Sequence, residues 1–150
     1  MIGRTAGGAT VATFQASIVL ILAMILGFRP HDWLMLAPAL AAMFLVALLF
    51  TTLGTWFAAM LSDFQGFQMI MNFLVMPMFF LSGAMFPLSN VPKVLQQVAS
   101  VDPLSYGVDA FRGLLLGASH FGLALDFAVL GAITVALLLL GSRAFSRIEA

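Results

Sequence analysis

Few side chains in this sequence could take part in chemistry, and several of them lie between residues 87 and 118. Asp109 and Arg112 are spaced i,i+3, so on a helix they would share a face and could form an ion pair. We favour this structural pairing over a role in substrate binding. His31 and His120 are far apart, and neither belongs to an H-E-x-x-H pattern, so we expect no metal site.

The sequence lacks the residues that several other types of reaction require. The sequence contains no cysteine, which excludes disulfides and thiolate chemistry. It has no G-x-x-x-x-G-K-[ST] phosphate loop and no G-x-S-x-G serine, so neither ATP hydrolysis nor an intramembrane serine hydrolase is expected. The formal net charge is zero, which gives no sign of a nucleic-acid partner. We therefore expect no enzyme activity and no cofactor.

One carboxylate stands within an apolar run. Asp126 lies near the start of residues 121–141, and an ionisable group inside a membrane span is a functional hypothesis by default. Because it is close to the start of the run, we favour a place in the outer headgroup region. A proton or substrate role is the alternative.

The composition indicates what kind of secondary structure holds these residues. Of the 150 residues, 63% are hydrophobic and only 8% are charged, whereas soluble domains have about 25% charged residues. Long stretches carry no Asp, Glu, Lys or Arg, and each is long enough for a helix of about 20 residues to cross a bilayer. The chain is therefore expected to be a membrane protein.

The predicted fold class is all-α, a polytopic membrane helix bundle. Continuous apolar runs, rather than alternating ones, exclude a β-barrel. Four transmembrane helices are expected at about residues 8–28, 34–61, 69–86 and 121–141. Residues 62–68, SDFQGFQ, are interpreted as a polar link between the second and third spans.

The stretch from 87 to 118 is too polar and too rich in proline for a span. Two short interfacial or re-entrant helices are expected, at about residues 92–99 and 103–116. Pro92 is suited to the start of the first helix. Asp102 followed by Pro103 is typical of an N-cap and a first helical position, which would open the second.

The end of the third span carries helix-breaking residues. Pro77 removes a backbone donor in mid-span and should bend the helix, either as a tolerated kink or as a bend that shapes a transport path. Ser82 and Gly83 are interpreted as a helix end, since serine can bond freed carbonyls and glycine permits unusual backbone angles. The alternative is a break that lets the chain re-enter the outer leaflet.

Residues 74–117 resemble the C-terminal part of ABC-2 type transporter permeases. Such permeases carry a proline-containing span, F-L-S-G, F-P with a later proline, N-P-L-x-Y and an alanine-arginine pair, in that order. The matching residues here are Pro77, Phe80-Leu81-Ser82-Gly83, Phe86-Pro87, Pro92, Asp102-Pro103-Leu104-Ser105-Tyr106 and Asp109-Ala110-Phe111-Arg112. Asp102 replaces the usual asparagine, and Phe111 separates the last pair. Drug-resistance and nodulation-factor exporter permeases are the most similar subgroup.

The resemblance implies a subunit of an ATP-driven exporter in the cytoplasmic membrane that moves a drug, lipid or glycolipid. Its partners would be an ATP-binding cassette ATPase subunit and a second permease, in a homodimer or heterodimer, within lipid. Both termini would be cytoplasmic and residues 87–118 external. Equal numbers of Lys and Arg are expected on the two sides of the membrane, so the positive-inside rule does not decide the orientation. Asp63, Gln65 and Gln68 would form a solvated cytoplasmic link or contact the ATPase.

Permeases of this family usually have six spans, and this chain corresponds to the last four. We interpret it as a fragment of a longer permease or as a truncated product. The alternative function is a non-transporting membrane protein that acts as an interaction or assembly partner.

Overall fold

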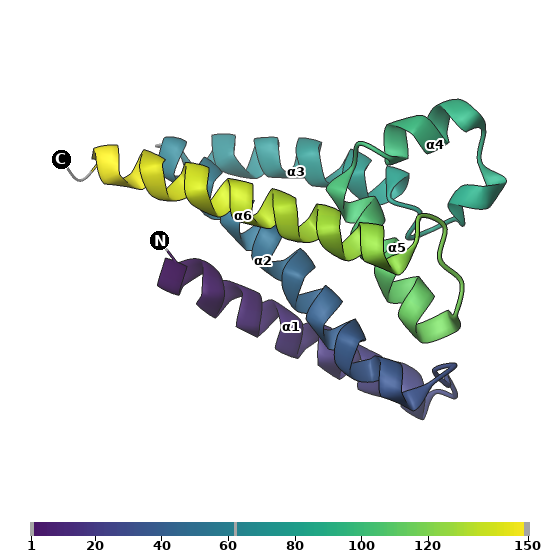
Figure 1. Ribbon diagram of the computed structural model, residues 1–150. Helices are drawn as coiled ribbons and strands as arrows, with labels where there is room; N and C mark the ends of the chain where they lie inside the picture. The colour runs from purple at the N-terminus through teal and green to yellow at the C-terminus, as the bar shows by residue number, and fades with distance from the viewer. Residues whose placement is uncertain (1, 62, 149–150) are drawn as a thin grey trace.

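The structure, a computed structural model, describes residues 2–61 and 63–148, with side chains from 3 to 142 within those ranges. In these ranges every regular element is helical (Figure 1). The α-helices are α1 (Ile2–Ile25), α2 (Leu36–Met60), α3 (Phe64–Leu81), α4 (Lys93–Ala99), α5 (Pro103–Leu116) and α6 (Leu123–Ile148). Two 3₁₀ turns, η1 (Trp33–Met35) and η2 (Leu88–Asn90), complete the list.

Four of the helical segments are long and apolar enough to cross a bilayer, which confirms the predicted all-helical membrane fold. They are Gly3–Ile25, Trp33–Met60, Phe64–Leu81 and Leu123–Ser142. Figure 1 shows both termini at one end of the bundle, with α4 and α5 at the other. The two short helices lie between the third and fourth spans, as expected.

Some helices begin or end at other residues than the expected spans, and the difference is clearest for the third. It covers Phe64–Leu81 rather than residues 69–86. The Asp63 carboxylate accepts hydrogen bonds from the backbone N–H groups of Gln65 (3.2 Å) and Gly66 (3.0 Å). This N-cap starts the helix within the stretch interpreted as a link, because it satisfies amides that a helix start leaves free. Gln65 and Gln68 therefore lie on α3.

The outer helices extend further than their apolar runs. α1 begins at Ile2 rather than near residue 8, and α6 continues to Ile148, beyond the expected end at 141. Hydropathy marks only the part of a helix that suits the hydrocarbon core, whereas backbone hydrogen bonding continues into the polar layer.

The best-packed part of the bundle is built by α1, α2, α5 and α6. A core of Leu20, Ala39, Ala42, Ala110, Leu114 and Leu115 joins α1, α2 and α5. The alanines let helix backbones approach closely, which is the usual basis of helix packing in membranes. By contrast, α3 has no buried residue along its length.

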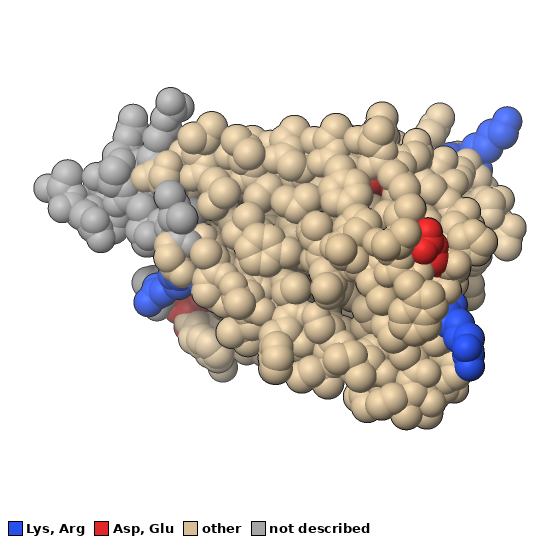
Figure 2. Space-filling model, turned by 60° about the horizontal axis from the view of Figure 1, so that its bottom comes forward, with Lys and Arg blue, Asp and Glu red and all other residues tan. Residues whose placement is uncertain are grey.

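Charged side chains gather at the two ends of the molecule. Figure 2 shows blue and red atoms at both ends of one face and a broad middle that is almost free of them. This distribution suits a body whose middle lies in hydrocarbon, where charges are costly. The side chains of Arg143 and Arg147, which entered the charge count, lie outside the described residues.

Candidate functional site

The residues of the sequence motif meet around α5. Asp102 caps the helix by accepting a hydrogen bond from Leu104 N (2.9 Å), and Pro103 occupies the first turn. The Tyr106 hydroxyl donates to the Ser100 carbonyl (2.7 Å), which ties α5 to the end of α4. The Tyr106 ring also lies 4.9 Å, between ring centroids, from Phe121 at the approach to α6. These contacts fix the start of α5 between its neighbours.

The Asp102 carboxyl group has an unusual pKa for an N-cap. Burial raises its pKa from 3.8 to about 6, against the opposing effect of hydrogen bonds from Leu104 N and Ser105 Oγ. A pKa raised by folding means that the folded chain binds the proton more tightly than the unfolded chain. This contribution to stability is present below pH 4 and is lost as the pH rises through 6.

The Asp102→Asn variant should therefore gain stability relative to the native chain as the pH rises from 4 to 8. Asparagine caps helices as well as aspartate does but carries no charge that burial would penalise. The shift in pKa corresponds to a change of about 2–3 kcal/mol in the difference between the two unfolding free energies. Denaturant titration in detergent micelles at both pH values measures it, and a pH-independent difference would contradict the assignment.

Asp109 and Arg112 do not form the predicted ion pair, since no salt bridge within 4.0 Å joins these two described residues. Asp109 instead accepts hydrogen bonds from Ser119 Oγ (2.9 Å), His120 N (2.7 Å) and Phe121 N (2.7 Å). These donors belong to the link that leads into α6. The carboxylate therefore holds the α5–α6 turn, and backbone amides replace the expected guanidinium partner.

Arg112 points to a different element. Its guanidinium donates a hydrogen bond to the Gly83 carbonyl (3.0 Å), just after the end of α3. Gly83 has a φ of +79°, and a Cβ placed there would lie 2.9 Å from Leu88 Cγ, so both backbone and space favour glycine. Arg112 thereby connects α5 to the C-terminal end of α3.

The preceding residue closes the same helix end. Ser82 is only 1% exposed, and its hydroxyl donates to the Phe79 carbonyl (2.8 Å) and accepts from Ala84 N (3.3 Å). α3 passes through Pro77 without interruption and stops at Leu81. Pro87 and Pro92 are the N-cap residues of η2 and α4. Phe86, which lies between α3 and η2, is exposed.

Asp126 lies in the first turn of α6 and is completely buried. Neither of its carboxylate oxygens has a hydrogen-bond partner in the described part of the chain. Asp109 is close enough to interact with it electrostatically. The helix N-terminus stabilises negative charge, whereas burial and the nearby Asp109 carboxylate disfavour it at this position.

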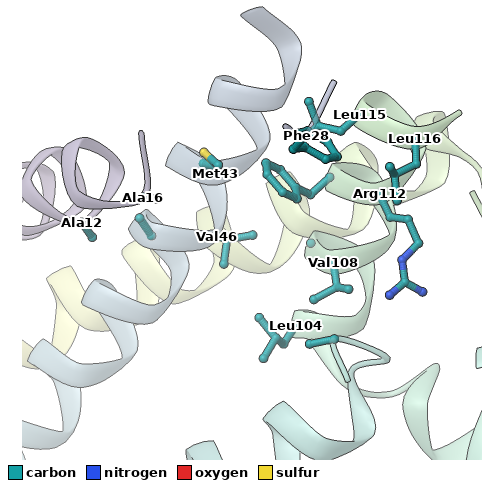
Figure 3. A pocket seen from close by; sticks show the side chains of 14 residues that line it. Ala12, Ala16, Phe28, Met43, Val46, Leu104, Val108, Arg112, Leu115 and Leu116 are labelled. Atoms are coloured by element: carbon teal, nitrogen blue, oxygen red, sulfur yellow. The ribbon is translucent and has the colours of Figure 1, made fainter. Parts of the chain in front are cut away.

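An apolar cleft of about 560 Å³ opens between α1, α2 and α5 (Figure 3). Ala12 and Ala16 line it from α1, and Met43 and Val46 line it from α2. From the side of α5 the lining residues are Leu104, Gly107, Val108, Phe111, Arg112, Leu115 and Leu116. In Figure 3 the Arg112 guanidinium lies at the edge of this lining. The cleft thus offers an apolar surface with one cation at its rim.

The other predicted site residues lie away from this cleft. Asp63, Gln65 and Gln68 are exposed around the start of α3, at the end of the bundle that also carries the N-terminus (Figure 1). Residue 62, which belonged to the expected link, lies outside the described residues. No cluster of His, Cys, Asp or Glu suited to a metal ion occurs in the described ranges.

Sequence reasoning missed most of the cleft. Val46 and Gly107 are 61 positions apart, yet a Cβ on Gly107 would overlap the Val46 side chain. Gly107 itself was the signal that the sequence offered. Glycine destabilises the middle of a helix, so its presence there usually reflects close packing against another helix. Ser119 was also missed, and no local pattern links it to Asp109.

These features define a class of protein: a multi-pass membrane protein with two short helices at one end and an apolar cleft between two of its spans and one of the short helices. The comparisons with known proteins narrow this class. Residues 1–116 match the ABC-2 type transporter family, and the chain belongs to that family.

The most similar relatives include Nodulation protein J of Rhizobium leguminosarum bv. viciae, which is 32% identical over 130 residues, 87% of this chain and 49% of the relative. Nodulation protein J of Rhizobium meliloti is 31% identical, and the matched region is 82% of this chain and 47% of that relative. The inner membrane transport permease YadH of Escherichia coli is 26% identical, and the matched region is 92% of this chain and 53% of that relative. The chain spans about half the length of these relatives. No solved structure matches it significantly.

Proposed function

We propose that the chain is the membrane-spanning part of a permease subunit of an ATP-driven exporter in the cytoplasmic membrane. Its family is one of transporters, and one relative is named an inner membrane transport permease. ATP hydrolysis would take place on a separate ATP-binding subunit, and two permease subunits would form the pathway. The phosphate loop that ATP hydrolysis needs is absent from the sequence.

The observation that carries the proposal is the cleft between α1, α2 and α5. Its lining is almost wholly apolar, with the Arg112 guanidinium at the edge. Such a surface suits an amphipathic substrate, with the hydrocarbon part in the cleft and a polar group near Arg112. The flexible side chain of Met43 in the lining can adapt to hydrophobic molecules of different shape.

We also propose that both termini are cytoplasmic and that residues 87–118 face outward, as in the family. Because the chain has no cysteine, single cysteines report its orientation without interference. A cysteine at the exposed Lys93 should react with an impermeant maleimide in intact cells, and one at Asp63 only after permeabilisation. The reverse pattern would overturn the orientation.

Transport by the complete complex tests the function. The chain should co-purify with an ATP-binding subunit, and an NBD-labelled lysophospholipid in proteoliposomes should stimulate ATP hydrolysis and be moved across the membrane. Ala16→Trp, which fills the cleft, should remove most of the stimulation, while Val19→Trp on the exposed face of α1 should not. Failure to bind the ATP-binding subunit or to change its hydrolysis rate would refute the proposal.

A further inference from the structure

Asp126 is a buried carboxyl group that the proposed function does not use. It lies in the first turn of α6, and its side chain is 0% exposed. Neither of its oxygens has a hydrogen-bond partner in the part of the chain that the structure describes. An ionised carboxylate without a donor is strongly disfavoured in such a place, because nothing replaces the water that burial removes. Asp126 therefore requires a ligand that neutralises its charge.

The group next to Asp126 is another carboxylate. Asp109 belongs to α5, which packs against α6 (Figure 1). It lies within hydrogen-bonding reach of Asp126, and the two negative charges repel each other. Two ionised carboxylates have only acceptor oxygens, so no hydrogen bond can form between them. With one proton the same contact becomes a hydrogen bond, in which an O–H donates to a carboxylate.

The other hydrogen bonds decide which carboxyl group holds this proton. Asp109 accepts from Ser119 Oγ (2.9 Å) and from the backbone N–H groups of His120 (2.7 Å) and Phe121 (2.7 Å). Donors of this kind stabilise the charged form of a carboxyl group. Asp126 has no such donor in the described ranges. The proton therefore belongs on Asp126, with its O–H directed to Asp109.

The charged and titratable groups on neighbouring elements are directed elsewhere. The Arg112 guanidinium donates to a backbone carbonyl just after α3. The His120 ring is exposed and lies edge-on to Phe121, with ring centroids 4.8 Å apart. Asp102 and Tyr106 form their hydrogen bonds at the start of α5. The sequence of α2, the other helix packed against α6, contains no ionisable side chain. None of these described groups therefore supplies a positive charge to the carboxyl pair.

Asp109 gives the pair access to water. It lines a cavity of about 150 Å³ whose wall includes Ser89, Ser119 and His120. This volume is several times the roughly 30 Å³ that one water molecule occupies in the liquid, and the polar wall offers it hydrogen-bond partners. Because Asp109 contacts both the cavity and Asp126, a proton can pass between water and the enclosed carboxyl group through Asp109.

We propose that Asp109 and Asp126 form a binding site for one proton, which Asp126 holds and donates in a hydrogen bond to the Asp109 carboxylate. Binding takes a proton from water, forms an O–H bond on Asp126 and lowers the charge of the pair from two negative charges to one. The bound proton joins α6 to α5, and its release leaves two adjacent carboxylates that repel each other.

The proton site does not depend on the proposed transport function. It also does not depend on what covers the bundle from outside. Because Asp126 is already enclosed by described residues, a further segment packed against these helices would leave its surroundings unchanged.

Infrared spectroscopy of the purified chain tests the protonation directly. Maltoside detergent micelles are suitable because they contain no ester carbonyl. At neutral pH the spectrum should contain the C=O stretching band of a protonated carboxyl group, which shifts when the aspartate carboxyl carbons are labelled with carbon-13. Asp126→Asn should lose this band. Asp102→Asn, which leaves the pair intact, should keep it. Absence of the band in both the native chain and Asp102→Asn would overturn the proposal.

The pH dependence of stability tests the coupling between the proton and the fold. The amide of Asp126→Asn can donate to Asp109 as the protonated carboxyl group does, but it has no proton to release. The native chain should therefore lose stability relative to this variant as the pH rises from acid to alkaline, because its folded state binds a proton that its unfolded state lacks. The denaturant midpoints of both chains measure the loss, and a constant difference would contradict the site.

A small cation is the competing occupant of two neighbouring carboxylates. Sodium chloride would then stabilise the native chain more than N-methylglucamine chloride at equal ionic strength, since a ligand of the folded state raises its stability. We expect equal denaturant midpoints in the two salts. A sodium-dependent increase that Asp126→Asn removes would show that a cation occupies the site in place of the proton, and the proposal would be wrong.

Discussion

Replacement of Asp109 by alanine is expected to cost about 3–4 kcal/mol of unfolding free energy. The carboxylate accepts hydrogen bonds from Ser119 Oγ and from the backbone N–H groups of His120 and Phe121. Hydrogen bonds to a charged group contribute more than neutral ones, and the two half-buried amides would lose their acceptor. Denaturant titration in mixed micelles measures the loss.

Two further variants make the Asp109 result specific. Asp109→Asn keeps one acceptor oxygen and should lose only part of the stability. Asp63→Ala removes a carboxylate that also bonds two backbone amides but is exposed at a helix start, and it should cost only about 1 kcal/mol. If Asp109→Ala cost no more than Asp63→Ala, the role of Asp109 in holding the α5–α6 turn would be wrong.

The α5–α6 turn also shows where sequence reasoning failed. The i,i+3 spacing of Asp109 and Arg112 is a rule about one helix, and it takes no account of other partners. In the structure, the chain turns back at Gly117 and brings residues 119–121 to Asp109. Backbone amides carry no sequence signal, so the pattern alone could not indicate them as partners.

The number and order of the helices could be predicted because bilayer physics acts locally. A stretch without charge and long enough to span is a transmembrane helix whatever its neighbours are. The short helices were also predictable, since Pro92 and the Asp102-Pro103 pair set their starts. Capping depends on adjacent residues only, and so it can be inferred from the sequence.

The start of α3 shows the limit of hydropathy. Polar residues at positions 63–68 lowered the apolar average and suggested a link, but Asp63 caps a helix and Gln65 and Gln68 continue it. Polar side chains are acceptable in a helix where it enters the headgroup layer. A reading by capping residues would have placed this boundary correctly.

The cleft depends on tertiary structure. Val46 and Gly107 line one cleft although they belong to separate helices, and their contact depends on how α2 and α5 cross.

Replacement of Gly107 by valine is the second change with a large expected effect. A Cβ at Gly107 would overlap the Val46 side chain, whose β-branched form leaves it little freedom to move. Overpacking of a close contact costs about 1–3 kcal/mol, occasionally more. Because Gly107 and Val46 both line the cleft, displacement of α5 should also abolish substrate-stimulated ATP hydrolysis in the complete complex.

The same substitution elsewhere in the bundle separates this contact from a general effect of valine in a helix. A Cβ on Gly131 of α6 would meet no atom within 4 Å, so Gly131→Val should be nearly neutral. Val46→Ala, combined with Gly107→Val, makes room at the contact and should restore much of the lost stability and activity. Neighbouring substitutions that share a contact are not additive, and the double-mutant cycle measures this coupling. Additive effects of the two changes would show that α5 does not pack against α2 at this point.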